Sequence, residues 1–306
     1  MKIFITGHSG FIGQHIVERL KDGNELYFLK NDLRNYDAVR LEVLEANPDV
    51  IVHLAARTEV EKSFYEQTVF SEINYVGTVN LIEAAREVDG LQNFVFASTM
   101  EVYGWQPISD LIRDGKETDI EVFDETTTPY PNAPYSVAKM ACENYLEYAN
   151  RAYSFPYTIV RQTNAYGRKD NDFFVTEQVI TQMLKNPDEI NLGYGLPYRN
   201  FIYIDDLIDA WETIINNPTK CKNQVFCLGP DNAIRISDYV DMIAKKLNWN
   251  GKVNWNTKPK RPGEIYLLNS TNAKLTSVTG WEPKITLDVG LDRTIAFWRE
   301  KLNVNG

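Results

Sequence analysis

The chain has 306 residues, of which 43% are hydrophobic and 24% are charged, as in an ordinary globular protein. Its formal net charge of −10 argues against a nucleic-acid partner, because phosphates require a basic surface. The three cysteines, Cys142, Cys221 and Cys227, have neither the spacing of a metal site nor the number of a disulfide framework. No apolar run reaches membrane-spanning length, and the first predicted strand begins at residue 2. We therefore expect no metal, no membrane partner, no signal peptide and a cytoplasmic location.

The N-terminal segment predicts a strand, a glycine turn and a helix in succession. The strand covers residues 2–6 and the helix residues 14–20, and between them Gly7, Gly10 and Gly13 follow the spacing G-x-x-G-x-x-G. A helix start exposes unpaired N–H groups and the positive end of the peptide dipole. Because glycines allow the backbone to approach an anion closely, this turn predicts a pyrophosphate-binding site.

Strand and helix patterns alternate through the first half of the chain. The further predicted strands are 25–30, 50–54, 93–98 and 157–161, and the predicted helices are 36–46, 74–88 and 135–153. Apolar strands alternating with helices indicate an α/β fold with a doubly wound, Rossmann-type parallel sheet. Ligands of such sheets bind at the carboxyl ends of the strands.

The second half of the chain has a less regular pattern. Helices are predicted at 173–185, 237–247 and 287–302, a strand leading into a helix at 201–216, and a short strand at 225–228. We predict a dinucleotide-binding domain over 1–165 and a smaller α/β substrate-binding domain over 166–306, with chain exchange back to the first domain near 201–230. The connection 105–132 is rich in Asp, Glu and Pro, which fits either a solvated loop or a flap over the site.

Tyr135 and Lys139 are four residues apart, on one face of a predicted helix. A nearby ammonium stabilises phenolate, so we expect Lys139 to lower the pKa of Tyr135. Such a tyrosine can exchange a proton with a sugar hydroxyl during hydride transfer. Thr99, at the end of the preceding strand, offers a hydroxyl to the same cleft; the alternative for it is a turn cap.

In this order the motifs resemble those of the extended short-chain dehydrogenase/reductases of the nucleotide-sugar epimerase and dehydratase family, over nearly the whole chain. The motifs are Thr6-Gly7-x-x-Gly10-x-x-Gly13, Asp32-Leu33, His53-Leu54-Ala55-Ala56, Asn74, Ser98-Thr99, Tyr135-x-x-x-Lys139, Arg161-x-x-Asn164-x-Tyr166-Gly167, the run from Tyr198 to Leu207, and Arg261-Pro262-Gly263-Glu264. The resemblance implies NAD or NADP as cofactor and a nucleotide-diphosphate sugar as substrate. It also implies a homodimer packed through helices 75–88 and 134–153.

The resemblance assigns roles to individual positions. The catalytic residues would be Thr99, Tyr135 and Lys139, with Glu101 as a further base or only a polar loop residue. The cofactor would contact Gly7, Gly10, Phe11, Ile12, Gly13, Lys30, Asp32, Leu33, Leu54, Ala55, Ala56, Ser98, Tyr135, Lys139 and Gln162. The substrate would contact Asn164, Arg199, Arg261 and Glu264, where the two guanidinium groups suit paired phosphate oxygens.

Lys30 departs from the family pattern. It stands where an acidic residue usually binds the adenosine ribose hydroxyls. A cation there suits a 2′-phosphate and favours NADP, unless Lys30 is simply a solvated lysine at the end of a strand. Asp32 and Leu33 follow the second strand almost at once, as in the compact reductases of deoxysugar pathways.

Met100 is the second departure. Nucleotide-sugar 4,6-dehydratases resemble Thr-Asp-Glu at this point, whereas the chain has Thr99, Met100 and Glu101. Methionine cannot donate the proton that the departing hydroxyl needs, so we do not expect 4,6-elimination by that route.

These observations rank the candidate functions. The first is a nucleotide-sugar C4 epimerase, and the alternative is an NADPH-dependent nucleotide 4-keto-6-deoxysugar reductase. A non-catalytic dinucleotide-binding regulator is disfavoured because Thr99, Tyr135 and Lys139 are all present.

Overall fold

A six-stranded parallel sheet forms the centre of the computed structural model, which describes residues 1–116, 119–230 and 232–304. The strand order is β10-β5-β4-β3-β1-β2, and every neighbouring pair is parallel. The strands are β1 (Lys2–Thr6), β2 (Glu25–Phe28), β3 (Val50–His53), β4 (Asn93–Thr99), β5 (Tyr157–Gln162) and β10 (Gln224–Leu228). This order confirms the predicted doubly wound, Rossmann-type sheet.

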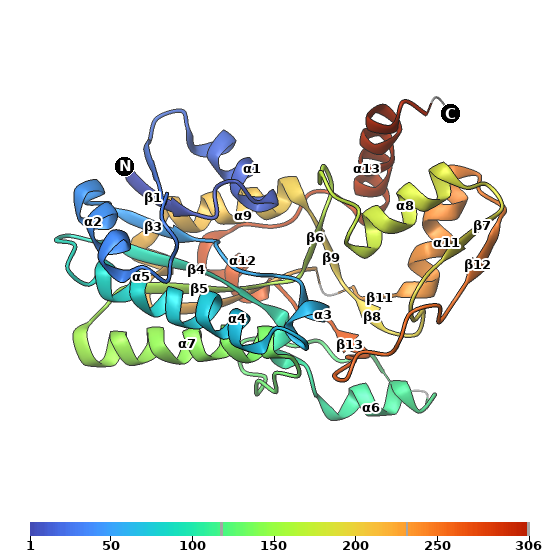
Figure 1. Cartoon of the computed structure of the whole chain (residues 1–306), viewed down its shortest axis with the longest axis horizontal. Helices are drawn as coiled ribbons and strands as arrows, with labels where there is room; N and C mark the ends of the chain where they lie inside the picture. Colours follow the sequence, from blue (N-terminus) through green and yellow to red (C-terminus); the bar gives the residue numbers. More distant parts are fainter. Residues whose placement is uncertain (117–118, 231, 305–306) are drawn as a thin grey trace.

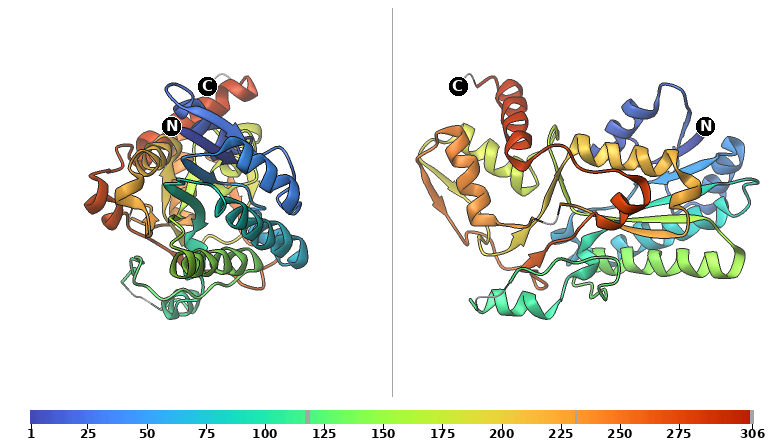
Figure 2. Two further views of the ribbon diagram at one scale, coloured as in Figure 1. Left: turned by 90° about the vertical axis from the view of Figure 1, so that its left-hand side faces the viewer. Right: turned by 180° about the vertical axis from the view of Figure 1, so that it is seen from behind.

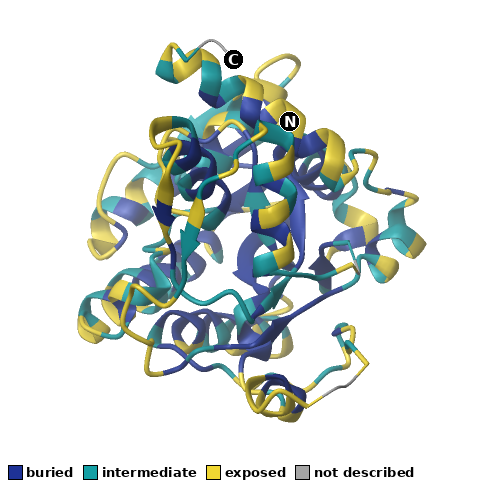
Figure 3. Cartoon of the chain, turned by 90° about the vertical axis from the view of Figure 1, so that its right-hand side faces the viewer, coloured by how far each residue is buried: buried dark blue, intermediate teal, exposed yellow. Residues whose placement is uncertain are grey.

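Helices cover both faces of the sheet (Figures 1 and 2). Along β1 the side chains alternate: Ile3 and Ile5 pack on the face covered by α1 and α9, and Phe4 packs on the opposite face. The helices of the first face are α1 (Phe11–Leu20) and α9 (Ile204–Asn216), and those of the second are α2 (Tyr36–Ala46), α5 (Gly77–Ala85) and α7 (Pro134–Tyr153). Because both faces are covered, β3 and β4 are buried along their whole length (Figure 3).

Two element boundaries in the first half differ from the prediction. The strand predicted to reach residue 30 ends at Phe28, because the N–H groups of Lys30 and Asn31 bond to Glu42 instead of a neighbouring strand. The helix predicted for 74–88 has the wrong limits at both ends, because α5 begins at Gly77 and ends at Ala85. Before it lie α3 (Val60–Ser63), α4 (Gln67–Ser71) and the π-helical segment η1 (Glu72–Val76).

The second half builds three small sheets and their helices, on the right in Figure 1. The strands are β6 (Asn164–Tyr166) paired with β9 (Phe201–Tyr203), β7 (Glu189–Asn191) with β12 (Lys252–Asn254), and β8 (Tyr198–Arg199) between β11 (Ile234–Arg235) and β13 (Leu267–Leu268). The helices beside them are α8 (Val175–Lys185), α11 (Ile236–Leu247) and α13 (Leu287–Leu302), whereas α10 (Pro218–Cys221) packs on α9 and α12 (Ala273–Thr279) packs on β10. Since α9 and β10 pack with the first half, the chain returns there between 204 and 228. The division at residue 165 stays a prediction.

The connection 105–132 is more structured than a solvated loop. It contains α6 (Pro107–Arg113), and Ile108, Ile112 and Phe123 are buried in one apolar cluster. Phe123 forms a β-bridge with Ser270, so the connection is attached to the second half. Residues 117 and 118 lie outside the described residues, and a role as a flap stays a prediction.

All three cysteines are free and buried. Across the described ranges, no helix has the length and apolarity needed to cross a membrane. In the same ranges, no three His, Cys, Asp or Glu side chains gather in a way that could hold a metal ion.

Candidate active site

The glycine turn leaves no space for side chains where α1 meets the end of β1. Gly7 has a φ of +73°, and a Cβ on it would lie 2.6 Å from the nitrogen of Ala55. A Cβ on Gly13 would lie 2.1 Å from the Gly7 carbonyl oxygen, so α1 packs directly on the turn. Gly10 precedes the helix and donates its N–H to that same carbonyl at 3.0 Å.

The start of α1 fits the pyrophosphate of a dinucleotide. Phe11 and Ile12 are the first helical residues, so their N–H groups have no carbonyl partner within the helix. Within the described residues, the first turn carries no acidic side chain that would oppose an anion. In the turn itself, the Nδ1 atom of His8 is buried without a hydrogen-bond partner among the described residues. These donors and the close approach at Gly7 fit NAD or NADP.

The segments predicted to contact the adenosine lie on the same edge of the sheet. Leu54, Ala55 and Ala56 follow β3, and Ala55 donates its N–H to Thr6 Oγ1 at 3.2 Å. Leu33 is buried against Gly77. Asp32 is exposed, and its bonds from Arg34 lower its pKa to about 2. Lys30 is exposed directly beyond β2.

Thr99 and Tyr135 meet at the carboxyl end of β4. Helix α7 begins at Pro134, where Ser136 Oγ accepts the N–H of Ala133, and this start fixes Tyr135 in its first turn. The Thr99 hydroxyl acts on the Tyr135 phenol and favours its ionised form. The same Thr99 oxygen also accepts the N–H of Glu101 at 3.1 Å and caps the 3₁₀ segment η2 (Met100–Tyr103). Thr99 is therefore both a site residue and a turn cap.

The prediction that Lys139 lowers the pKa of Tyr135 is wrong for this structure. The Lys139 ammonium donates to the Ala97 carbonyl at 2.7 Å and lies 4.6 Å from the centre of the Phe96 ring. Burial raises the pKa of Tyr135, the Glu101 carboxylate raises it further, and Thr99 only partly opposes them. Burial also lowers the pKa of Lys139, to about 8. Tyr135 is thus a neutral phenol in this conformation.

Three of the predicted substrate residues gather around Glu101. Arg199 Nη2 lies 3.7 Å from Glu264 Oε1, and the same nitrogen donates to the Ile265 carbonyl at 2.8 Å. Burial raises the pKa of Glu101, whereas Arg199 and Arg261 act in the opposite direction. Arg199 and Arg261 therefore act electrostatically on Glu101, and Glu101 in turn acts on Tyr135.

A family model described as the NAD dependent epimerase/dehydratase family matches residues 3–229. The chain belongs to this family. It is therefore an enzyme of the extended short-chain dehydrogenase/reductases, in a family that depends on NAD, and the predicted resemblance is confirmed.

The relatives of the chain include 4-epimerases, 4,6-dehydratases and a trifunctional enzyme whose name also includes a UDP-4-keto-L-rhamnose-reductase. A putative UDP-glucose 4-epimerase of Methanocaldococcus jannaschii is 29% identical, over 96% of the chain and 97% of the relative. The dTDP-D-glucose 4,6-dehydratase of Mus musculus is 25% identical, over 99% and 90%. The crystal structure of the Thermotoga maritima UDP-glucose 4-epimerase with UDP-glucose has a TM-score of 0.88 at 25% identity, over 99% and 100%. That of the Thermus thermophilus UDP-glucose 4-epimerase with NAD has a TM-score of 0.85 at 26%, over 98% and 99%.

The family resemblance predicted ligand contacts for three further side chains. In this structure they form hydrogen bonds within the protein. Asn164 donates to the Asn200 carbonyl at 3.3 Å, and Gln162 accepts the indole N–H of Trp211 at 3.1 Å. The Ser98 hydroxyl donates to Glu143. Ligand contacts of these residues stay predictions.

Met100 packs in a buried cluster of mostly apolar side chains. Its side chain is 2% exposed and lies in the apolar cluster of Val102, Ile108 and Leu267. The position held by an acid in the dehydratases is therefore part of the core in this family member.

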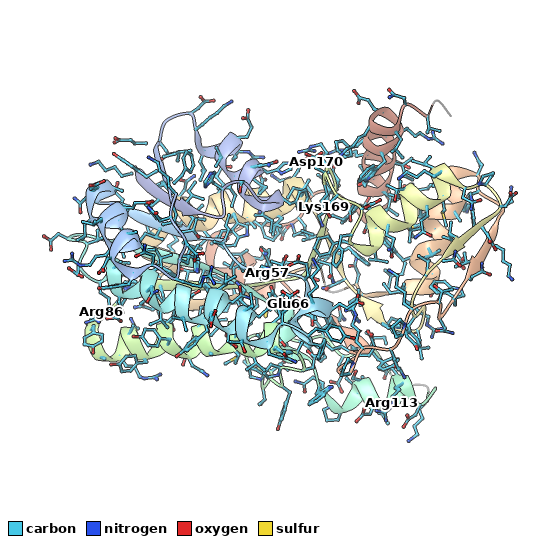
Figure 4. The ribbon with its side chains drawn as sticks, viewed as in Figure 1. Arg57, Glu66, Arg86, Arg113, Lys169 and Asp170 are labelled. Carbon is cyan, nitrogen blue, oxygen red and sulfur yellow. The ribbon has the colours of Figure 1, made fainter. Side chains whose placement is uncertain are left out.

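Lys169 is a candidate site residue that the sequence did not indicate. It lies where the two halves of the chain meet (Figure 4). Its ammonium is buried 4.6 Å from the centre of the Phe11 ring, donates to the Ala165 carbonyl at 2.9 Å, and lies 3.9 Å from Glu177. Burial lowers its pKa. A single lysine in a loop gives no sequence signal, because its neighbour Phe11 is distant along the chain.

Proposed function

We propose that the enzyme is a nucleotide-sugar C4 epimerase. The observation that carries the proposal lies at the carboxyl end of the sheet, where Thr99 and Glu101 act on the pKa of Tyr135 and where Arg199 and Arg261 act on the pKa of Glu101. A hydroxyl and a phenol adjoin a pair of guanidinium groups there, which suits a sugar carbinol attached to a diphosphate. The epimerases among the relatives support the same reaction.

Each residue has a defined task in this proposal. NAD, when bound, would supply the hydride acceptor for oxidation and the hydride donor for reduction of the sugar carbon from its other face. Once its own proton has passed to solvent, Tyr135 accepts the proton of the sugar hydroxyl and later gives it back, and Thr99 orients that oxygen. Lys139, one turn further along α7, supplies a positive charge that would hold the nicotinamide ribose, and Arg199 and Arg261 bind the diphosphate.

Met100 is the argument against 4,6-dehydration. Elimination of water requires an acid for the leaving hydroxyl, and a buried thioether provides no such proton. The alternative function, an NADPH-dependent 4-keto-6-deoxysugar reductase, is favoured by the exposed ammonium of Lys30 beyond β2.

The substrate panel is the decisive experiment. We expect purified protein, incubated with UDP-, GDP-, CDP- and dTDP-hexoses, to form the C4 epimer of one of them without net consumption of added cofactor. Chromatography of the sugar nucleotides measures the product, and absorbance at 340 nm measures cofactor. A 4-keto-6-deoxy product, or stoichiometric oxidation of NADPH with a 4-keto sugar, would overturn the proposal.

The lowered pKa of Lys139 predicts that the reaction rate depends on pH. Burial places its pKa at about 8, so its ammonium is lost as the pH rises through that value. Initial rates should be constant below this point and fall by about tenfold per pH unit well above it. The variant Lys139→Arg keeps its charge and should lose this decline, whatever its absolute rate. A wild-type profile that stays flat to pH 9.5 would contradict a role for the ammonium.

The proposal includes a homodimer in the cytoplasm. Val76, Val137 and Tyr148 are exposed on η1 and α7, within the helices predicted to form the contact. A second copy of these helices would cover the apolar side chains.

A further inference from the structure

A carboxylate from α2 accepts the backbone N–H groups that follow strand β2. The N–H of Lys30 donates to Glu42 Oε2 at 2.8 Å, and the N–H of Asn31 donates to Glu42 Oε1 at 3.2 Å. The side-chain amide of Asn31 donates to the same Oε1 atom. Two successive backbone donors and an amide therefore converge on one anion, which comes from within the chain.

This anion lies on the cofactor side of the sheet. Phe28, the last residue of β2, pairs with Ile5 of β1, and its ring centre is 4.7 Å from that of His8 in the glycine turn. Lys30 is two residues further on. In dinucleotide-binding sheets the adenosine ribose lies at the end of the second strand, where an acidic group binds its hydroxyls or a cation accommodates a 2′-phosphate.

The two cofactors meet Glu42 differently. A ribose hydroxyl can donate to the carboxylate, because Oε2 accepts only the Lys30 N–H and has a lone pair left. A 2′-phosphate has no proton to offer at neutral pH and carries like charge, so it must compete with Glu42 for the Lys30 and Asn31 donors.

The nearby cations do not outweigh this carboxylate. Arg34 bonds to Asp32 at 2.6 Å and lies 3.8 Å from Glu72, so its charge is already balanced. Lys30 is exposed, and a solvated ammonium on a flexible stem contributes little to binding.

We infer that Glu42 selects NAD over NADP by occupying the backbone donors that a 2′-phosphate would use. The carboxylate expected at the end of the second strand is present, but it comes from the following helix. The inference reverses the expectation that Lys30 favours NADP, and it rests on the cofactor site of the family rather than on the C4 epimerisation.

Equilibrium dialysis of the full-length protein against equal concentrations of NAD and NADP tests this selection. The bound nucleotides are released by denaturation and quantified by chromatography. We expect wild-type protein to carry NAD in at least about tenfold excess, and Glu42→Ala to reduce that excess by about tenfold or more. Glu42→Gln removes the charge but keeps an acceptor, so we expect a smaller reduction. The control Glu45→Gln removes an exposed carboxylate from the same helix and should leave the ratio unchanged.

Two results would overturn the inference: a wild-type preference for NADP, or the same ratio in wild type, Glu42→Gln and Glu42→Ala. If Glu42→Ala does not fold, as measured by thermal unfolding, Glu42→Gln decides the question alone. Lys30→Ala separates the two explanations, since a large change in the ratio for this variant with none for Glu42→Gln would assign the selection to Lys30. No sugar is present, so failure here leaves the epimerase proposal intact, and failure of the substrate panel leaves this result intact.

Discussion

Replacing Tyr135 with phenylalanine is expected to lower turnover by about 10²- to 10⁴-fold, which is the usual contribution of a positioned acid or base. The variant removes a single oxygen, the phenol oxygen on which Thr99 and Glu101 act. Burial keeps this phenol protonated in the absence of ligands, so it can donate a proton to a keto oxygen as it stands, but it must be deprotonated before it can accept the proton of a sugar hydroxyl. The measurement is the initial rate on the substrate that the panel identifies.

A matched control lies on the same helix. Tyr148 is exposed on α7 and its hydroxyl bonds to that of Tyr153, so Tyr148→Phe should keep turnover within about twofold of wild type. Equilibrium dialysis with NAD separates catalysis from binding, and Tyr135→Phe should retain the cofactor. Turnover close to wild type in Tyr135→Phe would contradict the mechanism of both the epimerase and the reductase.

Replacing Arg161 with methionine is expected to lower the free energy of unfolding by about 3–5 kcal/mol, the usual cost of leaving one buried partner of an ion pair uncompensated. Arg161 and Glu143 are 5% and 0% exposed, and Arg161 Nη2 bonds to Glu143 Oε2 at 2.6 Å. Arg161 Nη1 also donates to the Tyr103 hydroxyl at 2.8 Å. The variant leaves a buried carboxylate with the Ser98 hydroxyl as its remaining described donor.

Chemical denaturation measures this loss, and two variants control it. The double variant Arg161→Met with Glu143→Leu removes both charges, so it should recover a large part of the stability. Arg151→Met breaks an exposed pair with Glu147 one turn apart on α7, and should cost about 0.5 kcal/mol or less. If Arg161→Met lowers the free energy of unfolding as little as Arg151→Met does, the buried ion pair does not stabilise the fold.

The buried pair also bears on the geometry of the site. Glu143 lies one helical turn beyond Lys139 on α7, Arg161 is in β5, and Ser98 precedes Thr99 in β4. Bonds among these three side chains connect the helix that carries Tyr135 to the strand that carries Thr99. Their distance in sequence explains why no local pattern indicates the connection.

Sequence alone determined the elements whose signals are local. The limits of α2 and α13 follow from periodicity and end signals within each segment, and the glycine turn follows from three spaced glycines between a strand and a helix. The order of Thr99, Tyr135 and Lys139 also predicted a site at the carboxyl end of the sheet, because consecutive βα units place such residues at one edge.

Tertiary structure decided what depends on neighbours distant along the chain. The pairing of β10 with β5, the hydrogen bonds of Glu42 beyond β2, and the burial of Lys169 against Phe11 each join segments that the sequence separates, and of these the sequence had predicted only that the chain returns to the first domain near 201–230. The protonation state of Tyr135 also depends on neighbours that are distant along the chain. Its spacing from Lys139 predicted a lowered pKa, but the pKa is raised because burial and Glu101 act on the phenol while Lys139 bonds to a carbonyl. Spacing along a helix determines which residues share a face, whereas the electrostatic environment of a group is a property of everything packed around it.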